Sequence, residues 1–338
     1  MANTEMKTGI NKIDLLGYIK EQKLNKIVAK DKEGNEYNAI SGKMVLKCGE
    51  YKEIDVHVAP FASKELTSKG EVSKKYLTLV DIADGKLPTM ASAKEDELPT
   101  VVNIWGNTSD DPEKQFTPNI GENMYKDKRT NEVRTNLQLN LGFGNITVKD
   151  NVKEEDFKAE FDVEIYVESI AEEIKPETNE ATGRTIVSGY LPLFGGLVAP
   201  IELVAGIIKD DNGDDFDMGQ AIFDNLREGD TFSANGDINF EKRITETKTS
   251  GKGFGRAKVE TKTDYINEFN ILYGELVEDP QRMFEEEDIK QALVQRDNKK
   301  EEVKNKEDKE ETKEKKPRGM GGSSRTTEGT EKRQRRGF

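Results

Sequence analysis

The sequence predicts an all-β fold, because short apolar segments rich in β-branched residues recur along most of its 338 residues. Clusters of Gly, Asp, Asn and Lys separate these segments, as expected for turns between strands. One segment alternates with particular clarity, since polar residues or glycine separate Leu137, Leu139, Leu141 and Phe143. This period of two predicts a strand over 135–148 with one buried face that includes Phe143.

The predicted strands fall into two groups, separated by a charged stretch at 149–156 that lacks apolar periodicity. The first group comprises 13–19, 37–47, 53–58, 75–82, 100–105 and 135–148. The second begins near Phe157, has Phe161, Val163, Ile165 and Val167 on one alternating face, and continues through 184–190, 197–208, 231–240 and 258–273. Two β domains are therefore predicted, over 1–150 and 151–280, each of a common single-domain size.

Helix is scarce in this sequence. Ile289, Ala292 and Leu293 lie at helical spacing behind an acidic first turn, which predicts a short helix at 281–296. Beyond it the chain is rich in Lys and Glu and then in Gly, Ser, Thr and Arg. Such a segment buries too little surface to offset its ordering entropy, so 297–338 is predicted to be a disordered charged tail. The tail either solubilises the protein or contacts nucleic acid or a partner through its basic end.

Composition limits the function classes. The formal net charge of -14 argues against a uniformly basic surface that coats duplex DNA, because Lys and Arg contacts to phosphates supply most non-specific affinity. A local basic groove is still compatible, since charge is screened over roughly 8 Å at physiological salt. Cys48 is the only cysteine and no secretory leader pattern follows Met1. These two features predict a cytoplasmic protein without disulfides.

The stretch 190–208 is the most apolar part of the chain. Pro192, Pro200, Glu202 and several glycines interrupt it. A continuous membrane helix does not tolerate this many breaks, so buried strands around a turn are predicted instead, and no membrane association.

The sequence offers no pattern typical of an active site. Its one histidine, His57, lies between Val56 and Val58 and is interpreted as a strand residue on the less buried face. The run from Asp210 to Asp217 resembles the start of a calcium loop, but Asp215 replaces the required glycine and no glutamate closes the loop. No phosphate-binding glycine loop is present. We therefore expect no catalysis, no cofactor and no bound metal.

Three segments combine cations with an aromatic ring, an arrangement that suits a single-stranded nucleic acid because cations contact phosphates while rings stack on bases. A solvated or locally packed surface is the commoner explanation for any one such segment, but three of them in a net-acidic chain favour binding. The candidate residues are Lys252, Phe254, Arg256 and Lys258 in the run GKGFGRAK; Lys64, Lys69, Lys74, Lys75 and Tyr76; and Tyr125, Lys126, Lys128, Arg129 and Arg134. Trp105, the only tryptophan, is either a further stacking residue or a core or domain-interface residue.

Several segments resemble bacteriophage single-stranded DNA-binding proteins built from tandem OB-folds. These are NKIDLLGYIKEQKLN, NAISGKMVLKCG, TGRTIVSGYLPLFGGLVAP and GFGRAKVETKTDYINEFNILYGE, followed by the charged tail. The resemblance implies two OB-fold-like β-barrels in tandem, each binding DNA on strands 2 and 3 and the flanking loops.

Carried onto this chain, the resemblance points to 44–58 with Tyr51 and to 64–76 in the first barrel. In the second barrel it points to Tyr190, Phe194 and 251–258. The chain departs from the family at its end. Bacterial members have an acidic tip before a terminal Phe, whereas arginines precede Phe338 here, which puts partner docking by this tip in doubt.

These features predict a protein that coats and protects single-stranded DNA without sequence specificity during phage replication or recombination, with replication or recombination proteins as candidate partners of the tail. The alternative is a β-rich virion or assembly component whose domains make protein contacts. A weaker third hypothesis is a metal-assisted nuclease that uses acidic residues in 210–217.

Overall fold

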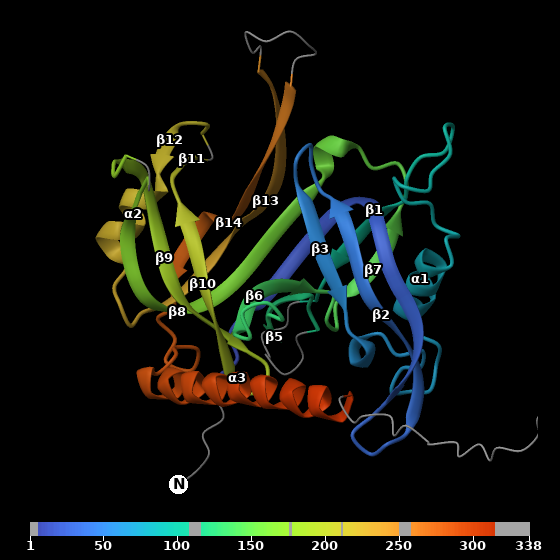
Figure 1. Ribbon diagram of the computed structural model, residues 1–338. Helices are drawn as coiled ribbons and strands as arrows, with labels where there is room; N and C mark the ends of the chain where they lie inside the picture. Colours follow the sequence, from blue (N-terminus) through green and yellow to red (C-terminus); the bar gives the residue numbers. More distant parts are fainter. Residues whose placement is uncertain (1–5, 108–115, 176–177, 211, 250–257, 315–338) are drawn as a thin grey trace, which may run out of the picture.

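The computed structural model describes residues 6–107, 116–175, 178–210, 212–249 and 258–314 (Figure 1). The fold is mainly β, as the sequence predicts. Two β-barrels lie side by side, a long hairpin projects from the second barrel, and a C-terminal helix runs along the opposite side of the molecule (Figure 1).

The first barrel has the strand order of an OB-fold. Its strands are β1 (Asn11–Lys30), β2 (Glu36–Lys47), β3 (Glu53–Val58), β4 (Val101–Trp105), β5 (Asn119–Lys126), β6 (Val133–Asn140) and β7 (Asn145–Lys149). β1 pairs with β2 and β4, β2 with β3, β3 in parallel with β6, and β4 with β7. Because β6 and β7 act as two halves of the fifth strand, these pairings close a five-stranded barrel. β5 lies outside the closed circuit and pairs with β6.

The second barrel repeats this order with unbroken strands. Its strands are β8 (Lys158–Ile174), β9 (Ala181–Leu193), β10 (Leu197–Ala205), β13 (Thr231–Thr249) and β14 (Lys258–Leu276). The circuit runs β8, β9, β10, β14, β13 and back to β8, with β10 and β14 parallel. Between β10 and β13 lie the hairpin of β11 (Ile207–Lys209) and β12 (Asp215–Asp217) and helix α2 (Met218–Asn225).

The two barrels share one sheet and one core. β1 pairs antiparallel with β8, from Asn11 opposite Val163 to Leu16 opposite Lys158. Ile13 on β1 and Phe161 on β8 are almost fully buried and belong to one hydrophobic cluster that extends through both barrels. The first strand of each barrel therefore forms the junction between them.

Helix α3 (Glu286–Glu314) contacts both barrels. Ile289 and Ala292 pack against Val198 at the start of β10, while residues further along contact β5. The helix extends beyond the predicted end at 296, so assigning all of 297–338 to the tail was wrong. Lys and Glu, which dominate 297–314, are good helix formers, which explains the continuation. The predicted tail residues 315–338 lie outside the described part of the chain.

The segment predicted as a strand at 75–82 is helix α1 (Lys74–Ala83), which connects β3 to β4. Ser73 caps it by accepting a hydrogen bond from the backbone N–H of Tyr76. Tyr76, Leu79 and Ala83 recur at helical spacing and pack on the barrel core. The apolar residues of this segment fit the spacing of a strand as well as that of a helix, and the Ser73 cap favours the helix.

The single strand predicted over 135–148 is interrupted. Gly142 adopts φ +48°, which ends β6 and turns the chain before β7. The alternation consequently fails at its last member: Leu139 and Leu141 are buried, but Phe143 is 53% exposed. Strand β5, the β11–β12 hairpin and α2 were not predicted.

The apolar stretch 190–208 forms strands around a turn, as predicted, in the end of β9 and in β10, whereas its last two residues begin the exposed strand β11. Within the described residues, no helix is both long and apolar enough to span a membrane.

Candidate nucleic-acid interface

One row of side chains crosses five neighbouring strands of the first barrel. The strand register places Lys23 opposite Lys43, Lys43 opposite His57, His57 opposite Asn140, and Asn140 opposite Asn119. Residues directly opposite one another point to the same face of a sheet. The alternate residues on β2, β3 and β6 are buried in the core, so this set, called the polar row below, lies on the outside of the barrel.

The β1–β2 end of the polar row is positively charged. Lys43 forms a salt bridge with Asp55 at 2.7 Å, whereas Lys23 is exposed and has no ion partner among the described residues. Like charges directly opposite one another on a sheet are unfavourable. A bound anion between Lys23 and Lys43 would relieve this repulsion, which makes the end of the row suitable for a phosphate.

The rest of the row is neutral and hydrogen-bonded. Burial lowers the pKa of His57 below its usual value, and Asp55 opposes this shift only in part. The Gln138 amide donates to Asn140 Oδ1 at 2.7 Å, and the Asn140 amide donates to Asn119 Oδ1 at 3.2 Å. These bonds orient the amides and leave further donors and acceptors facing solvent. The row therefore presents cations at one end and fixed neutral polar groups at the other.

The predicted patch at 64–76 is divided by the structure. Lys64 Nζ lies 4.4 Å from the centre of the Tyr37 ring, a cation–π contact near the β1–β2 turn. Lys69 and Lys74 are exposed. Lys75 instead donates to the carbonyl of Gly142 at 3.1 Å, and burial lowers its pKa to about 8. Tyr76 is partly buried and packs against the core, which leaves less of its ring open to a base.

The predicted patch at 125–134 lies at the outer end of β5 and β6. Tyr125 and Arg134 face each other across these strands, on the same face as Asn119, and Arg134 Nε lies 3.0 Å from Asp127 Oδ2. Lys128 and Arg129 lie in or beside the connecting turn and are accessible.

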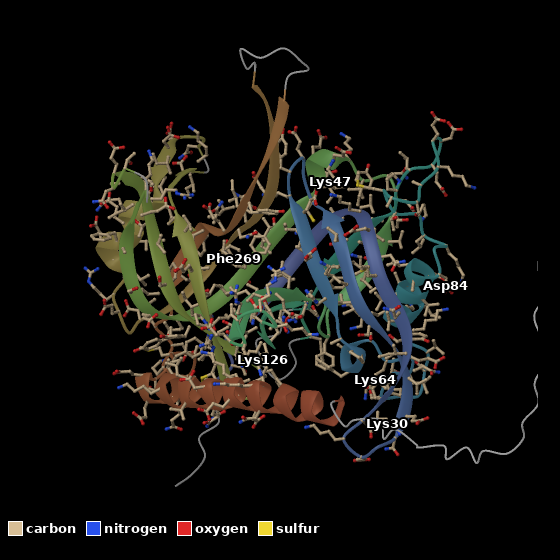
Figure 2. The ribbon with its side chains drawn as sticks, in the orientation of Figure 1. Lys30, Lys47, Lys64, Asp84, Lys126 and Phe269 are labelled. Atoms are coloured by element: carbon tan, nitrogen blue, oxygen red, sulfur yellow. The ribbon has the colours of Figure 1, made fainter. Side chains whose placement is uncertain are left out.

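Lys126 differs from its neighbours, because it is only 8% exposed. It points to the opposite face of β5 and lies just above α3 (Figure 2). Strand alternation explains the difference, since adjacent residues face opposite sides. The prediction of a surface cation at Lys126 was therefore wrong.

The other predicted residues are scattered. Tyr51 is 50% exposed in the β2–β3 turn, and Trp105 is half-buried at the end of β4, opposite Asn145. Lys258 begins β14. Lys252, Phe254 and Arg256 lie outside the described residues.

The outer face of the second barrel suits DNA less well. Tyr190 packs in the cluster under α3 and hydrogen-bonds Glu168, and burial raises its pKa to about 12. It is therefore not the open ring that the resemblance implied, although Phe194 is 95% exposed. Arg184 is held between Glu173 at 2.6 Å and Glu268 at 3.0 Å. Helix α3 and these carboxylates leave the first barrel as the better candidate.

The acidic run near Asp210 forms a turn. Asp210 Oδ1 accepts hydrogen bonds from the backbone N–H groups of Asn212 at 2.8 Å and Asp214 at 2.9 Å, which shapes the β11–β12 hairpin. No group of three or more His, Cys, Asp or Glu side chains within the described part of the chain could hold a metal ion.

A family model named YorF matches residues 10–309, which cover both barrels and most of α3. The chain belongs to the YorF family. That name denotes no biochemical activity, so the function of this YorF family member is argued from its surfaces. No curated protein matches its sequence.

Among solved structures, the YorF chain is similar to a deletion mutant of the single-stranded DNA binding protein from Thermus aquaticus. The identity is 10% and the TM-score is 0.37, over 80% of this chain and 97% of that chain. A likeness at this level carries no weight for function.

Proposed function

We propose that this YorF family protein binds single-stranded DNA, without sequence specificity, on the outer face of its first barrel. The observation that carries the proposal is the polar row, which runs without a break from Lys23 to Asn119. It crosses strands 2 and 3 of an OB-like barrel, the face on which this fold binds oligonucleotides.

The chemistry of the row favours an unpaired strand. Lys23 and Lys43 can contact phosphates, while Asn140, Asn119 and the neutral His57 can hydrogen-bond sugars or base edges. Base edges are accessible in a single strand but are paired within a duplex. Tyr125 and Arg134 continue the same face and add a ring and a cation.

The small number of exposed cations suits modest, salt-sensitive affinity. Each phosphate contact releases counterions, so binding weakens as salt rises. The net charge of -14 opposes approach of DNA to the molecule as a whole, so binding depends on local groups of cations such as Lys23 and Lys43.

The proposal includes a role in coating and protecting single strands during phage replication or recombination, with protein partners recruited through the tail, and it assigns no catalytic step to the chain. The alternative, a β-rich virion or assembly component, requires no DNA affinity.

Fluorescence anisotropy with labelled dT oligomers of increasing length, compared with a duplex of equal length, tests the proposal. We expect saturable binding to dT that weakens with salt and much weaker binding to duplex. Absence of dT binding at low salt would contradict the proposal and favour the assembly alternative. Recovering the labelled strand after incubation with magnesium tests the nuclease hypothesis, since shortened strands would show catalysis.

A further inference from the structure

Three phenylalanines that are distant in sequence form one exposed cluster on the first barrel. Phe61, Phe116 and Phe143 are 57%, 54% and 53% exposed. The rings of Phe61 and Phe143 have centroids 5.7 Å apart, and those of Phe116 and Phe143 are 6.3 Å apart, both pairs edge to face. Three large apolar rings are thus held together while more than half of each faces water, and we call them the phenylalanine cluster.

The backbone beside Phe61 is fixed. Phe61 lies in a short 3₁₀ turn (Pro60–Ala62) directly after β3. Ser63, which is 1% exposed, follows that turn and accepts a hydrogen bond from the backbone N–H of Ile40 at 3.2 Å. This bond ties the turn to β2.

The backbone beside the other two rings is also fixed. The turn that carries Phe143 is held by the N–H of Leu141, which donates to His57 O at 2.9 Å. Beside Phe116, the Thr117 hydroxyl donates to Asn11 O at 3.1 Å. Because the turns are already ordered, a ligand that contacts the rings has little further ordering entropy to overcome.

The phenylalanine cluster continues the polar row. Phe61 lies just beyond His57 on β3, Phe143 just beyond Asn140 on β6, and Phe116 just before Asn119 on β5. Because β3 and β6 are parallel and β5 is antiparallel to β6, all three rings lie at the same end of these strands. A row of polar groups is thus bordered by a row of aromatic rings.

We propose that Phe61, Phe116 and Phe143 form a stacking site for unpaired nucleobases of the strand that the polar row binds. This inference rests on the proposed function and extends it by a site. Flat rings stack on any base, which gives affinity without sequence preference. The Lys75 amino group, bonded to Gly142 O at 3.1 Å beside Phe143, adds a positive charge next to the rings when protonated.

The occupant is a nucleobase rather than an apolar protein segment because the cluster lies at the end of the strands that carry the polar row, and Lys75 is bonded beside Phe143. The members of the row on these strands, His57, Asn140 and Asn119, are polar. A strand of nucleic acid alternates charged phosphates with flat bases and matches this combination, whereas an apolar peptide would leave the polar row unused.

The test compares the full-length protein with the triple variant Phe61→Leu, Phe116→Leu, Phe143→Leu, which keeps apolar side chains but removes the rings. The matched control is Phe216→Leu, Phe223→Leu, Tyr273→Leu, which removes three exposed rings from the second barrel that are not binding candidates. Each protein is titrated with a dT oligomer and with an abasic oligomer of equal length, which has the same phosphates and no bases.

We expect the wild type and the control to prefer dT over the abasic strand by about ten-fold or more, and the cluster variant to lose most of that preference. Unchanged preference in the cluster variant would overturn the inference. Equal weakening for both oligomers would also overturn it, since that result indicates an apolar or structural role. If the wild type binds neither oligomer, the proposed function itself fails.

A Phe143→Trp variant provides a second readout. Stacking predicts quenching of its added indole emission by dT but not by the abasic strand. Equal emission changes with the two oligomers would contradict stacking at this position.

Discussion

Arg296 on α3 and Glu122 on β5 form a buried ion pair that ties the C-terminal helix to the first barrel. Arg296 Nε donates to Glu122 Oε2 at 2.9 Å, and the two side chains are 10% and 4% exposed. Hydrogen bonds from Arg296 to Glu122 raise the pKa of the guanidinium above its usual value. Ile289 and Ala292 pack on the second barrel, and the Arg296–Glu122 ion pair attaches the same helix to the first barrel.

Breaking this pair should destabilise the protein strongly. Replacing Arg296→Met leaves the Glu122 carboxylate buried without its partner, and we expect a loss of about 3–5 kcal/mol in the free energy of unfolding. Urea denaturation measures the loss. The double variant Arg296→Met, Glu122→Met should recover much of it, because no buried charge is left. A loss below about 1 kcal/mol in the single variant would contradict a buried pair.

The partly buried Lys75 should give the protein a specific pH dependence. Its folded pKa is lowered to about 8 by burial, so between that value and the ordinary lysine pKa the unfolded chain binds more protons than the folded chain. The contribution of Lys75 to the free energy of unfolding therefore rises as the pH rises from about 8 toward about 10.4. Below about pH 8 this contribution is constant.

Urea unfolding of the wild type and of Lys75→Met across this pH range tests whether Lys75 raises stability with pH. The other lysines and the tyrosines titrate alike in both proteins, so the difference between the two reports on Lys75. We expect the wild type to gain stability relative to the variant at high pH. A parallel pH dependence of the two proteins would show that Lys75 is not buried in this way.

Gly42 is a position where a side chain should disrupt the proposed interface. It adopts φ +141°, and an added Cβ would lie 2.0 Å from the carbonyl oxygen of Lys23. Gly42→Ala should therefore cost at least about 1–3 kcal/mol of stability and separate Lys23 from Lys43, weakening dT binding. Gly206→Ala, between β10 and β11 of the second barrel, has room for the methyl group, with the nearest atom at 3.5 Å, and serves as the control. Equal effects of both substitutions would contradict the proposed importance of this pairing.

A role in DNA binding for the segment GKGFGRAK remains a prediction from sequence alone. Replacing Phe254 and Arg256 together by alanine should weaken dT binding, because a ring and a cation are removed from a glycine-rich segment. Anisotropy titrations at fixed salt measure the effect. Unchanged affinity would remove this segment from the binding site.

Much of the fold follows from local patterns. The strand at 53–58 and the buried face of Phe161, Val163 and Ile165 follow directly from alternation. The secondary-structure predictions fail where a single residue determines the local conformation. Ser73 caps a helix where a strand was predicted, and Gly142 turns a strand that otherwise alternates through Phe143.

The candidate site was less predictable, because strand pairing creates it. Lys23, Asn119 and Asn140 are unremarkable in sequence and become neighbours of His57 only when β1, β5 and β6 are placed in register. His57 itself was assigned correctly to the less buried face. Local clusters of charge were a poorer guide, since Lys126 lies within such a cluster and is buried.

The salt dependence of dT binding by the double variant Lys23→Ala, Lys43→Ala tests most directly whether the outer face of the first barrel holds the strand. Each lost phosphate contact should lower the slope of log affinity against log salt by about 0.7, so we expect a decrease of roughly 1.4. The control Lys209→Ala, Lys290→Ala removes the same charge from the second barrel and α3 and should keep the wild-type slope. Equal slopes for the wild type and the Lys23, Lys43 variant would contradict the proposed interface.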